Sequence, residues 1–535
     1  MDTRTIIAFA LMIFIYIYFF QPKPVQHIAT NSIQISKEIP SSKSAGSAPA
    51  QAAQKSPEMN ALAAKTVELK NEKVVLELSG LGSVKSAEFL DFKVSAKDHS
   101  PTIQSFGERG FNSEILKTSL GIPQWRLVSS SESELQYQAT IGKLNVTRRI
   151  QLEPNSYILH FTDEITNSGA ESVRSDLGIT LHHTSNLKNA PSGFWKLFLP
   201  QTDLNEFVFL QDGSITRKPI EHLGSAFEKH ELFSWAGFGH KYFFYGLIPG
   251  NISFTDIKLE TNADLFSTGS LALSDKQIAP GETANYSYKY YLGPKEMPEL
   301  KKASPDLQKV IDYGDWIGPI ARFLLSILHL FYSIIPNYGV AIILLTILVK
   351  AVLYPLAYKS AVSMRKLQLV QPKMKEIREK YKNDKARMNS EMMSLYKTEK
   401  VNPIGGCLPL LLQMPVFFAL YRVFFSSIEL RQAPFFGWIQ DLSVHDPLFV
   451  TPILMTALMW YQTKITPTPP AAEDNETVRV QKAMMKWMPI VFGLIMIFLP
   501  AGLTLYFLVN ALLSVVQQVY LNKKLEKEFP ISAKA

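Results

Sequence analysis

A lysine stands in the middle of a long apolar segment of this chain. Residues 340–358 are apolar except for Thr346, Lys350 and the tyrosines, and Lys350 lies about 12–15 Å from either end at the rise of a helix. A charge at that depth in a membrane is costly, so the ammonium should face protein or water. The alternative is a lysine that only extends its stem toward the membrane surface. Thr346 and Tyr354 lie four residues to either side on the same helix face, which favours a functional lysine.

Other polar side chains occur in the apolar segments farther along. Gln413 lies in one of them, and another carries Asn510, Ser514, Gln517 and Gln518 at i, i+4, i+7 and i+8, which is one helix face. Each residue taken singly is explained by hydrogen bonds between membrane helices. As a stripe that faces Lys350, they would hydrate a groove inside the membrane.

Residues 359–404 form a basic insert, with twelve Lys and Arg against five Asp and Glu. Apolar residues recur at three- and four-residue spacing on both sides of Asn383-Asp384, which predicts an antiparallel helical hairpin. Its methionines are compatible with packing along the seam and equally with an adaptable contact surface. The candidate contact residues are Met374, Met388, Met392 and Met393.

A β-rich region precedes the membrane half. Leu135, Tyr137, Ala139 and Ile141 alternate with polar residues, and similar runs follow between turn signals such as Asp212-Gly213. This period of two predicts a large antiparallel β-sandwich. The predicted order is a signal-anchor span at 1–22, a flexible tether at 23–64, the β-domain at 65–300 and an interfacial amphipathic helix at 305–337.

The rest of the chain is predicted to be a multi-pass α-helical membrane region. The predicted spans are 338–358, 405–426, 448–464, 484–499 and 502–520, so the chain has six spans with the anchor. Lys and Arg concentrate in the hairpin 359–404, the loop 465–483 and the tail 521–535, whereas the loop 427–447 has only Arg431. The positive-inside rule places the hairpin and both termini in the cytoplasm and the β-domain outside.

Several function classes lack support in the residues. The chain shows no phosphate loop, nucleophile elbow or metal-ligand spacing, and its one cysteine, Cys407, allows no intrachain disulfide. His182 and His183 are adjacent in a predicted strand and point to opposite faces, so the pair cannot hold a metal from one side. No cofactor, metal or specific nucleic-acid sequence is expected. A transporter would show inverted repeats, and none is visible.

Several motifs are similar to those of one known family. The runs VNPIGGCLPLLLQMPVFFALYRVF, ELRQAPFFGWIQDLSVHDP and FLPAGLTLYFLVN, with the hairpin run QPKMKEIREKYKNDKARMNSEMMSLYKTEKVNP, resemble the YidC membrane insertases of Gram-negative bacteria, an Oxa-type family. The resemblance covers most of residues 338–525. The wider Oxa-type relatives share only the five-span membrane core.

The resemblance implies an insertase rather than an enzyme, located in the bacterial inner membrane with a periplasmic β-domain. Its water-filled groove carries one basic residue, usually arginine, and Lys350 stands in that place. Where the family often has two tyrosines in the last span, this chain has Tyr506 and Phe507. The expected partners are nascent membrane proteins, the Sec translocon, the ribosome and membrane lipids. The expected groove residues are Lys350, Thr346, Tyr354, Gln413, Tyr506, Asn510, Ser514 and Gln517.

Overall fold

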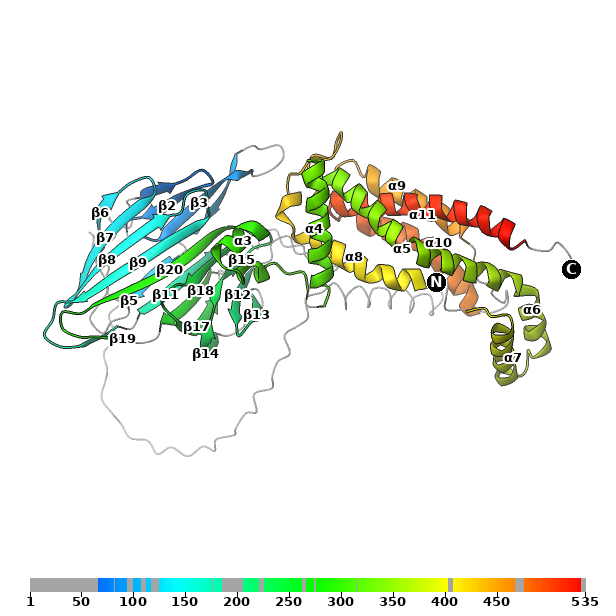
Figure 1. The fold of residues 1–535 in the computed structure, drawn as a ribbon, viewed down its shortest axis with the longest axis horizontal. Coiled ribbons are helices and arrows are strands. Elements are labelled where there is room, and N and C mark those ends of the chain that lie inside the picture. Colours follow the sequence, from blue (N-terminus) through cyan, green and yellow to red (C-terminus); the bar gives the residue numbers. More distant parts are fainter. Residues whose placement is uncertain are drawn as a thin grey trace, which may run out of the picture. The chain divides into compact units, whose positions relative to one another are not determined.

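A computed structural model of the protein describes residues 66–530, apart from 81, 94–99, 107–111, 117–124, 176, 185–204, 221–225, 262–265, 274–275, 315, 403–407 and 467–475. The predicted signal anchor and tether lie outside these residues. In the described part, strands make up the chain as far as Pro294 and helices follow from Met297 onward (Figure 1). The predicted change from a β-rich region to a helical region is confirmed.

In its described residues, the β-domain contains antiparallel sheets of nine, five, four and two strands. The nine-stranded sheet has the order β13 (Ser214–Pro219), β12 (Glu206–Gln211), β15 (Trp235–Gly239), β16 (Phe243–Pro249), β20 (Thr283–Pro294), β9 (Ile158–Asn167), β8 (Leu144–Leu152), β7 (Glu134–Ile141), β6 (Arg126–Ser130). The five-stranded sheet has β14 (Phe227–Phe233), β17 (Phe254–Thr261), β18 (Phe266–Leu273), β11 (Leu177–Thr184), β5 (Asn112–Leu116). The others are β1 (Thr66–Lys70), β2 (Val74–Ser79), β3 (Val84–Lys93), β4 (Pro101–Ser105), and the pair β10 (Val173–Ser175), β19 (Lys276–Ile278).

Alternating residues and tight turns explain these strands. Along β7 the side chains of Leu135, Tyr137, Ala139 and Ile141 are buried, as their period of two predicts. The turn between β12 and β13 is Asp212-Gly213, with φ of 46° and 75°. Positive φ at both central residues is the requirement of a type I′ hairpin turn, so the predicted turn is confirmed.

The sheets form two layers. Phe238 and Tyr245 are cross-strand partners on one face of the nine-stranded sheet. The Tyr245 ring packs against Phe89 of the four-stranded sheet, and the Phe238 ring packs against His183 of the five-stranded sheet. One face of the large sheet therefore covers both smaller sheets, which is a sandwich arrangement.

The helical region follows without a return to β structure. Its elements are α3 (Met297–Ala303), η4 (Leu307–Val310), α4 (Gly318–Ile334), α5 (Tyr338–Leu369), α6 (Gln371–Lys380), α7 (Lys385–Thr398), α8 (Leu408–Ser426), η6 (Ile428–Leu430), α9 (Val450–Ile465), α10 (Glu476–Met496) and α11 (Ala501–Glu528). α11 lies beside both α5 and α9 (Figure 1). Among the described residues, α5 and α11 are long and apolar enough to cross a membrane by themselves.

Some helix bounds differ from the predicted ones. The segment predicted as one interfacial helix at 305–337 is the short η4 followed by α4, because Gly314 has a φ of 80° and interrupts the helix. α5 continues past the predicted span end at 358 to Leu369, since good helix formers follow and the next proline is Pro372. α11 likewise continues to Glu528, where Lys524 and Glu528 pair one turn apart, so much of the predicted tail 521–535 is helical.

α5 carries two features that bear on the site. Its N-terminus is capped by Asn337, whose side chain accepts a hydrogen bond from the Val340 amide at 3.1 Å. Pro355 lies inside the helix, where it cannot donate the hydrogen bond that the carbonyl of Ala351 would accept in an unbroken helix.

Candidate functional site

Lys350 lies on α5 and reaches across to α11. Its ammonium donates a hydrogen bond to the Ser514 hydroxyl at 2.6 Å, and that hydroxyl donates to the Asn510 carbonyl one turn earlier at 2.7 Å. The spacing of Asn510 and Ser514 on one helix face, read from the sequence, therefore does place them opposite the lysine.

A third helix joins the same polar group. The Gln413 amide on α8 donates to the Asn510 side-chain oxygen on α11 at 3.0 Å. Polar side chains from α5, α8 and α11 thus form one connected group in a predominantly apolar helical region. This joins four of the residues predicted for the groove.

The positive charge in this group is uncompensated. In the described part of the chain, Lys350 forms no ion pair with a carboxylate, and its partner is a neutral hydroxyl. A neutral hydroxyl leaves the ammonium able to attract an acidic group from another molecule. The arrangement suits transient binding of negative charge.

The other predicted groove residues do not contact the ammonium directly. The Thr346 hydroxyl is buried and donates to the carbonyl of Ile342 in its own helix at 2.7 Å, so it satisfies the helix and leaves no free donor for a groove. Tyr354 is 37% exposed on the same helix. Tyr506 is buried, with its ring against Phe424 and Phe507.

The last helix also has polar residues that hold helices together. The Gln518 amide donates to the Asn522 side chain at 2.8 Å, and the Asn522 amide donates to the carbonyl of Ile465 at the end of α9 at 2.9 Å. The bond of Gln518 therefore lies within α11, and Asn522 makes the bond between α11 and α9. Gln517 is partly exposed and is left as a groove candidate.

The hairpin methionines divide into two groups. Met374 is buried at 2% exposure in a cluster with Leu367, Val370 and Val401, against which Met392 packs, so these two serve the seam. Met388 is partly exposed, and Met393 is 55% exposed. Of the four candidate contact residues, Met393 is the one that offers most of its side chain to a partner.

The sequence analysis did not predict a buried, hydrogen-bonded carboxylate just before α9, that of Asp446. The Asp446 carboxylate is 1% exposed and accepts hydrogen bonds from the Trp438 indole at 2.9 Å and from the Thr451 amide and hydroxyl at 2.8 Å each. Burial raises the pKa of Asp446, but these hydrogen bonds outweigh burial and hold its pKa below the usual range. Asp446-Pro447 just before an apolar run is the helix-start signal that could have revealed this cap.

The loop that contains Asp446, between η6 and α9, also bonds to the starts of two other helices. Its backbone carbonyls at Leu442 and Val444 accept from the amides of Gly502 and Ala501 at 2.8 and 2.6 Å, at the start of α11. The carbonyl of Phe435 accepts from the Asn337 side chain at 3.0 Å, at the start of α5. The loop between η6 and α9 is therefore bonded to the N-termini of α5, α9 and α11.

The described residues contain no group of three His, Cys, Asp or Glu side chains that could hold a metal ion. His183 instead lies in the sandwich beside His240, with ring centroids 4.6 Å apart, and burial lowers its pKa to about 4. Both rings are therefore neutral at ordinary pH.

Comparison with known proteins identifies both halves of the chain. Residues 330–528 match the family described as 60Kd inner membrane protein, and residues 66–327 match the YidC periplasmic domain. The membrane protein insertase YidC of Hahella chejuensis is 34% identical over 85% of this chain and 81% of its own length. That of Syntrophus aciditrophicus is 46% identical over 54% of this chain and 52% of its own length. A solved structure of an active YidC insertase aligns over 97% of this chain and 100% of that chain at 19% identity, with a TM-score of 0.35.

Proposed function

The chain belongs to the YidC family of inner-membrane insertases, and we propose that it inserts client proteins into the membrane through a hydrated groove built around Lys350. The observation that carries this proposal is the lysine held by the Ser514 hydroxyl at 2.6 Å, between α5 and α11, with no carboxylate partner among the described residues. A cation in that state is available to an acidic group of a client.

The physical task of the groove is to shorten an apolar path. A client must move a polar flank across a hydrocarbon layer about 30 Å thick. Water held by the side chains of Gln413, Asn510 and Ser514 reduces the thickness that is dry, and Lys350 attracts acidic residues of the flank. Burial of the client's apolar span in lipid then supplies the free energy, so no nucleotide or cofactor is required.

The proposed topology has six spans. The signal anchor, α5, α8, α9, α10 and α11 cross the membrane, with the β-domain in the periplasm and both termini in the cytoplasm. The basic excess of the hairpin and of the tail supports this orientation. α4 lies at the membrane surface, because Phe323 and Ile334 expose 65% and 67% of their side chains while Leu328 on its other face is buried.

The hairpin α6–α7 is then the part that contacts a ribosome or a nascent chain on the cytoplasmic side. Its basic charge suits the anionic surface of a ribosome as well as acidic parts of a nascent chain, and the lipid headgroups are a competing partner. The β-domain carries no catalytic constellation in its described residues and suits contact with a component such as the Sec translocon.

Reconstitution tests the main proposal. Purified protein in liposomes should insert a short single-span client without ATP, measured by protease protection of the translocated flank. Empty liposomes give the background. Protection no greater than this background would contradict insertase activity by the chain alone.

Variants of Lys350 test the role of the charge, with two clients that differ only in having acidic or neutral flanks. Lys350→Arg should keep activity, because arginine stays charged in poorly hydrated sites. Lys350→Ala should lower insertion of the acidic client about tenfold and leave the neutral client nearly unchanged, and Lys350→Glu should be worse for the acidic client. Equal loss for both clients would rule out the electrostatic role while leaving the family assignment untouched.

A further inference from the structure

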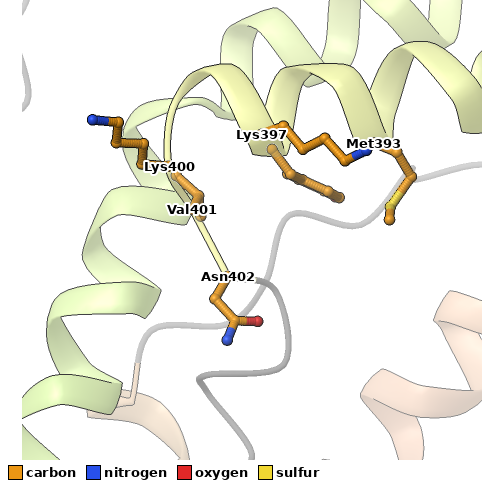
Figure 2. Close-up of a pocket in the computed structure, with 6 residues that line it drawn as sticks. Met393, Lys397, Lys400, Val401 and Asn402 are labelled. Atoms are coloured by element: carbon orange, nitrogen blue, oxygen red, sulfur yellow. The ribbon is translucent and has the colours of Figure 1, made fainter.

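The hairpin contains a small cavity where α7 ends. It has a volume of about 300 Å³ and is lined by Met393, Tyr396, Lys397, Lys400, Val401 and Asn402. Figure 2 shows Lys397 lying alongside Met393, with Val401 and Asn402 on the chain that leaves the helix and Lys400 extending to the other side. Ligand sites commonly measure roughly 300–1,000 Å³, so this one suits a few side chains rather than a whole helix.

The way α7 ends builds this cavity. Lys400 has a φ of 50°, a left-handed conformation that usually belongs to glycine after a helix, and the chain reverses there. The Val401 amide then donates to the carbonyl of Tyr396 at 2.9 Å, which brings Val401 back against the helix. The carbonyl of Asn402 accepts from the Ser363 hydroxyl on α5 at 2.7 Å, so this wall is tied to the membrane helix.

The cavity combines an apolar floor with an unpaired charge. Val401 is 6% exposed and Met393 is 55% exposed, so the floor is fixed on one side and adaptable on the other. The neighbouring carboxylate of Glu399 is bound by Lys373 at 2.6 Å. Among the described residues, Lys397 forms no ion pair with a carboxylate, and Glu399, the acidic residue nearest to it in the sequence, pairs with Lys373.

We propose that this cavity binds a short segment of a client in which an apolar side chain stands next to a carboxylate. This inference rests on the proposed insertase function and names the first contact that the hairpin makes. The apolar floor favours a peptide over the phosphates of RNA or lipid, because phosphates would use the lysine and leave Met393 and Tyr396 without a partner. A segment captured there carries the acidic residues that Lys350 receives later.

Peptide binding to the full chain tests the proposal independently of insertion. The protein is placed in nanodiscs of zwitterionic lipid, and the probe is a short fluorescein-labelled peptide with two leucines flanked by aspartates, followed by anisotropy. Lys397→Gln should weaken binding about fivefold, and Met393→Ser should do the same. Lys382→Gln, which removes an equal charge near the hairpin turn, is the matched control and should change affinity less than about twofold.

Companion probes separate the alternatives. A peptide with serines in place of the leucines should bind at least about fivefold more weakly than the original. Equal binding of both peptides, or equal weakening by Lys397→Gln and Lys382→Gln, would overturn the proposal in favour of diffuse charge attraction. If an RNA oligonucleotide or phosphatidylglycerol vesicles depend on Lys397 while the peptide does not, the cavity is a phosphate site and the proposal is wrong. Liposomes that insert clients while the peptide fails to bind would reject the cavity and retain the insertase.

Discussion

One buried and one half-buried cation show how differently the β-domain and the helical region treat charge. Arg148 in β8 is 2% exposed and is held by two hydrogen bonds of 2.7 and 2.8 Å to the Asp163 carboxylate, with its guanidinium over the Trp125 ring. Lys350 in α5 has one neutral hydroxyl as its partner. Asp163 compensates the charge of Arg148, whereas no carboxylate among the described residues compensates the charge of Lys350.

The two cations differ in how much attraction each keeps for a ligand. A compensated buried pair holds two strands in register and has little attraction left for a ligand. An uncompensated cation costs stability unless its environment hydrates it, so its presence needs another reason. Substitutions in the two regions test this distinction.

The largest effect is expected from breaking the pair in the sandwich. Arg148→Met leaves Asp163 buried without its partner and should lower the free energy of unfolding of the β-domain by about 3–5 kcal/mol. Hydrogen exchange of the β8 and β9 amides in the full-length protein measures this. Arg148→Met combined with Asp163→Leu should recover part of the loss. Unchanged protection in Arg148→Met would mean that compensation contributes nothing to the fold.

A second effect comes from the buried histidines, which the sandwich keeps neutral. Burial lowers the pKa of His183 to about 4 and that of His240 well below its ordinary value, and His240 also faces the Lys295 ammonium. Because burial depresses both folded pKa values, this contribution to stability is complete above about pH 6.5 and is lost as the pH falls toward 4, by on the order of 3 kcal/mol for His183 alone.

Hydrogen exchange of the β-domain at pH values from 7 to about 4, corrected for the intrinsic exchange rate, tests this expectation. His183→Gln should reduce the pH dependence, and the part that comes from His240 should remain. His160→Gln is the matched control, because His160 is partly exposed beside Glu153 at 3.1 Å. A slope that survives His183→Gln unchanged would assign the pH response to other groups.

The third experiment gives Lys350 a carboxylate partner within the protein. Ser514→Asp would place a carboxylate where the hydroxyl now accepts from Lys350 at 2.6 Å. Insertion of an acid-flanked client should then fall about tenfold, as in Lys350→Ala, because the charge is satisfied internally. Ser514→Asn, in which the new side chain matches aspartate in size but is neutral, should lower insertion of the same client less than about twofold. Full activity of Ser514→Asp would show that the availability of the charge is irrelevant.

The smallest effect belongs to an exposed pair in the same sandwich. Lys70 and Glu132 lie 3.1 Å apart with side chains 51% and 79% exposed. Lys70→Gln should change the free energy of unfolding by less than about 0.5 kcal/mol, because water screens the pair. Urea-dependent hydrogen exchange at β1 and β2 measures the change. If Lys70→Gln lowered the free energy of unfolding as much as Arg148→Met, burial would not be what determines the contribution of an ion pair to stability.

Local patterns in the sequence predicted much of the fold. Alternation at Leu135 and Tyr137 fixed the strand faces, and Asp212-Gly213 fixed a hairpin turn, because both depend on neighbouring residues alone. The spacing of Asn510 and Ser514 predicted one polar helix face in the same way. That Ser514 is the direct partner of Lys350 required the depth and rotation of α5 relative to α11, which no local pattern contains.

The misses have the same origin. Met374 and Met393 look alike in the sequence, and only the packing of the hairpin buries the first and exposes the second. Asp446 lies in the predicted loop 427–447, and no local pattern indicates that its carboxylate accepts hydrogen bonds from both Trp438 and Thr451. Interactions that depend on how helices and loops pack together cannot be predicted from the periodicity of the sequence.

Pro355 has a consequence for the mobility of α5. The helix lacks one internal hydrogen bond at the Ala351 carbonyl, immediately after Lys350, so bending there breaks one bond fewer than elsewhere along the span. The C-terminal half of α5 leads into the hairpin, while its N-terminal end is bonded through Asn337 to the carbonyl of Phe435 in the loop. α5 can therefore bend about one turn from Lys350. Movement of the hairpin then tilts the C-terminal half of α5, while the N-terminal half stays bonded to the loop.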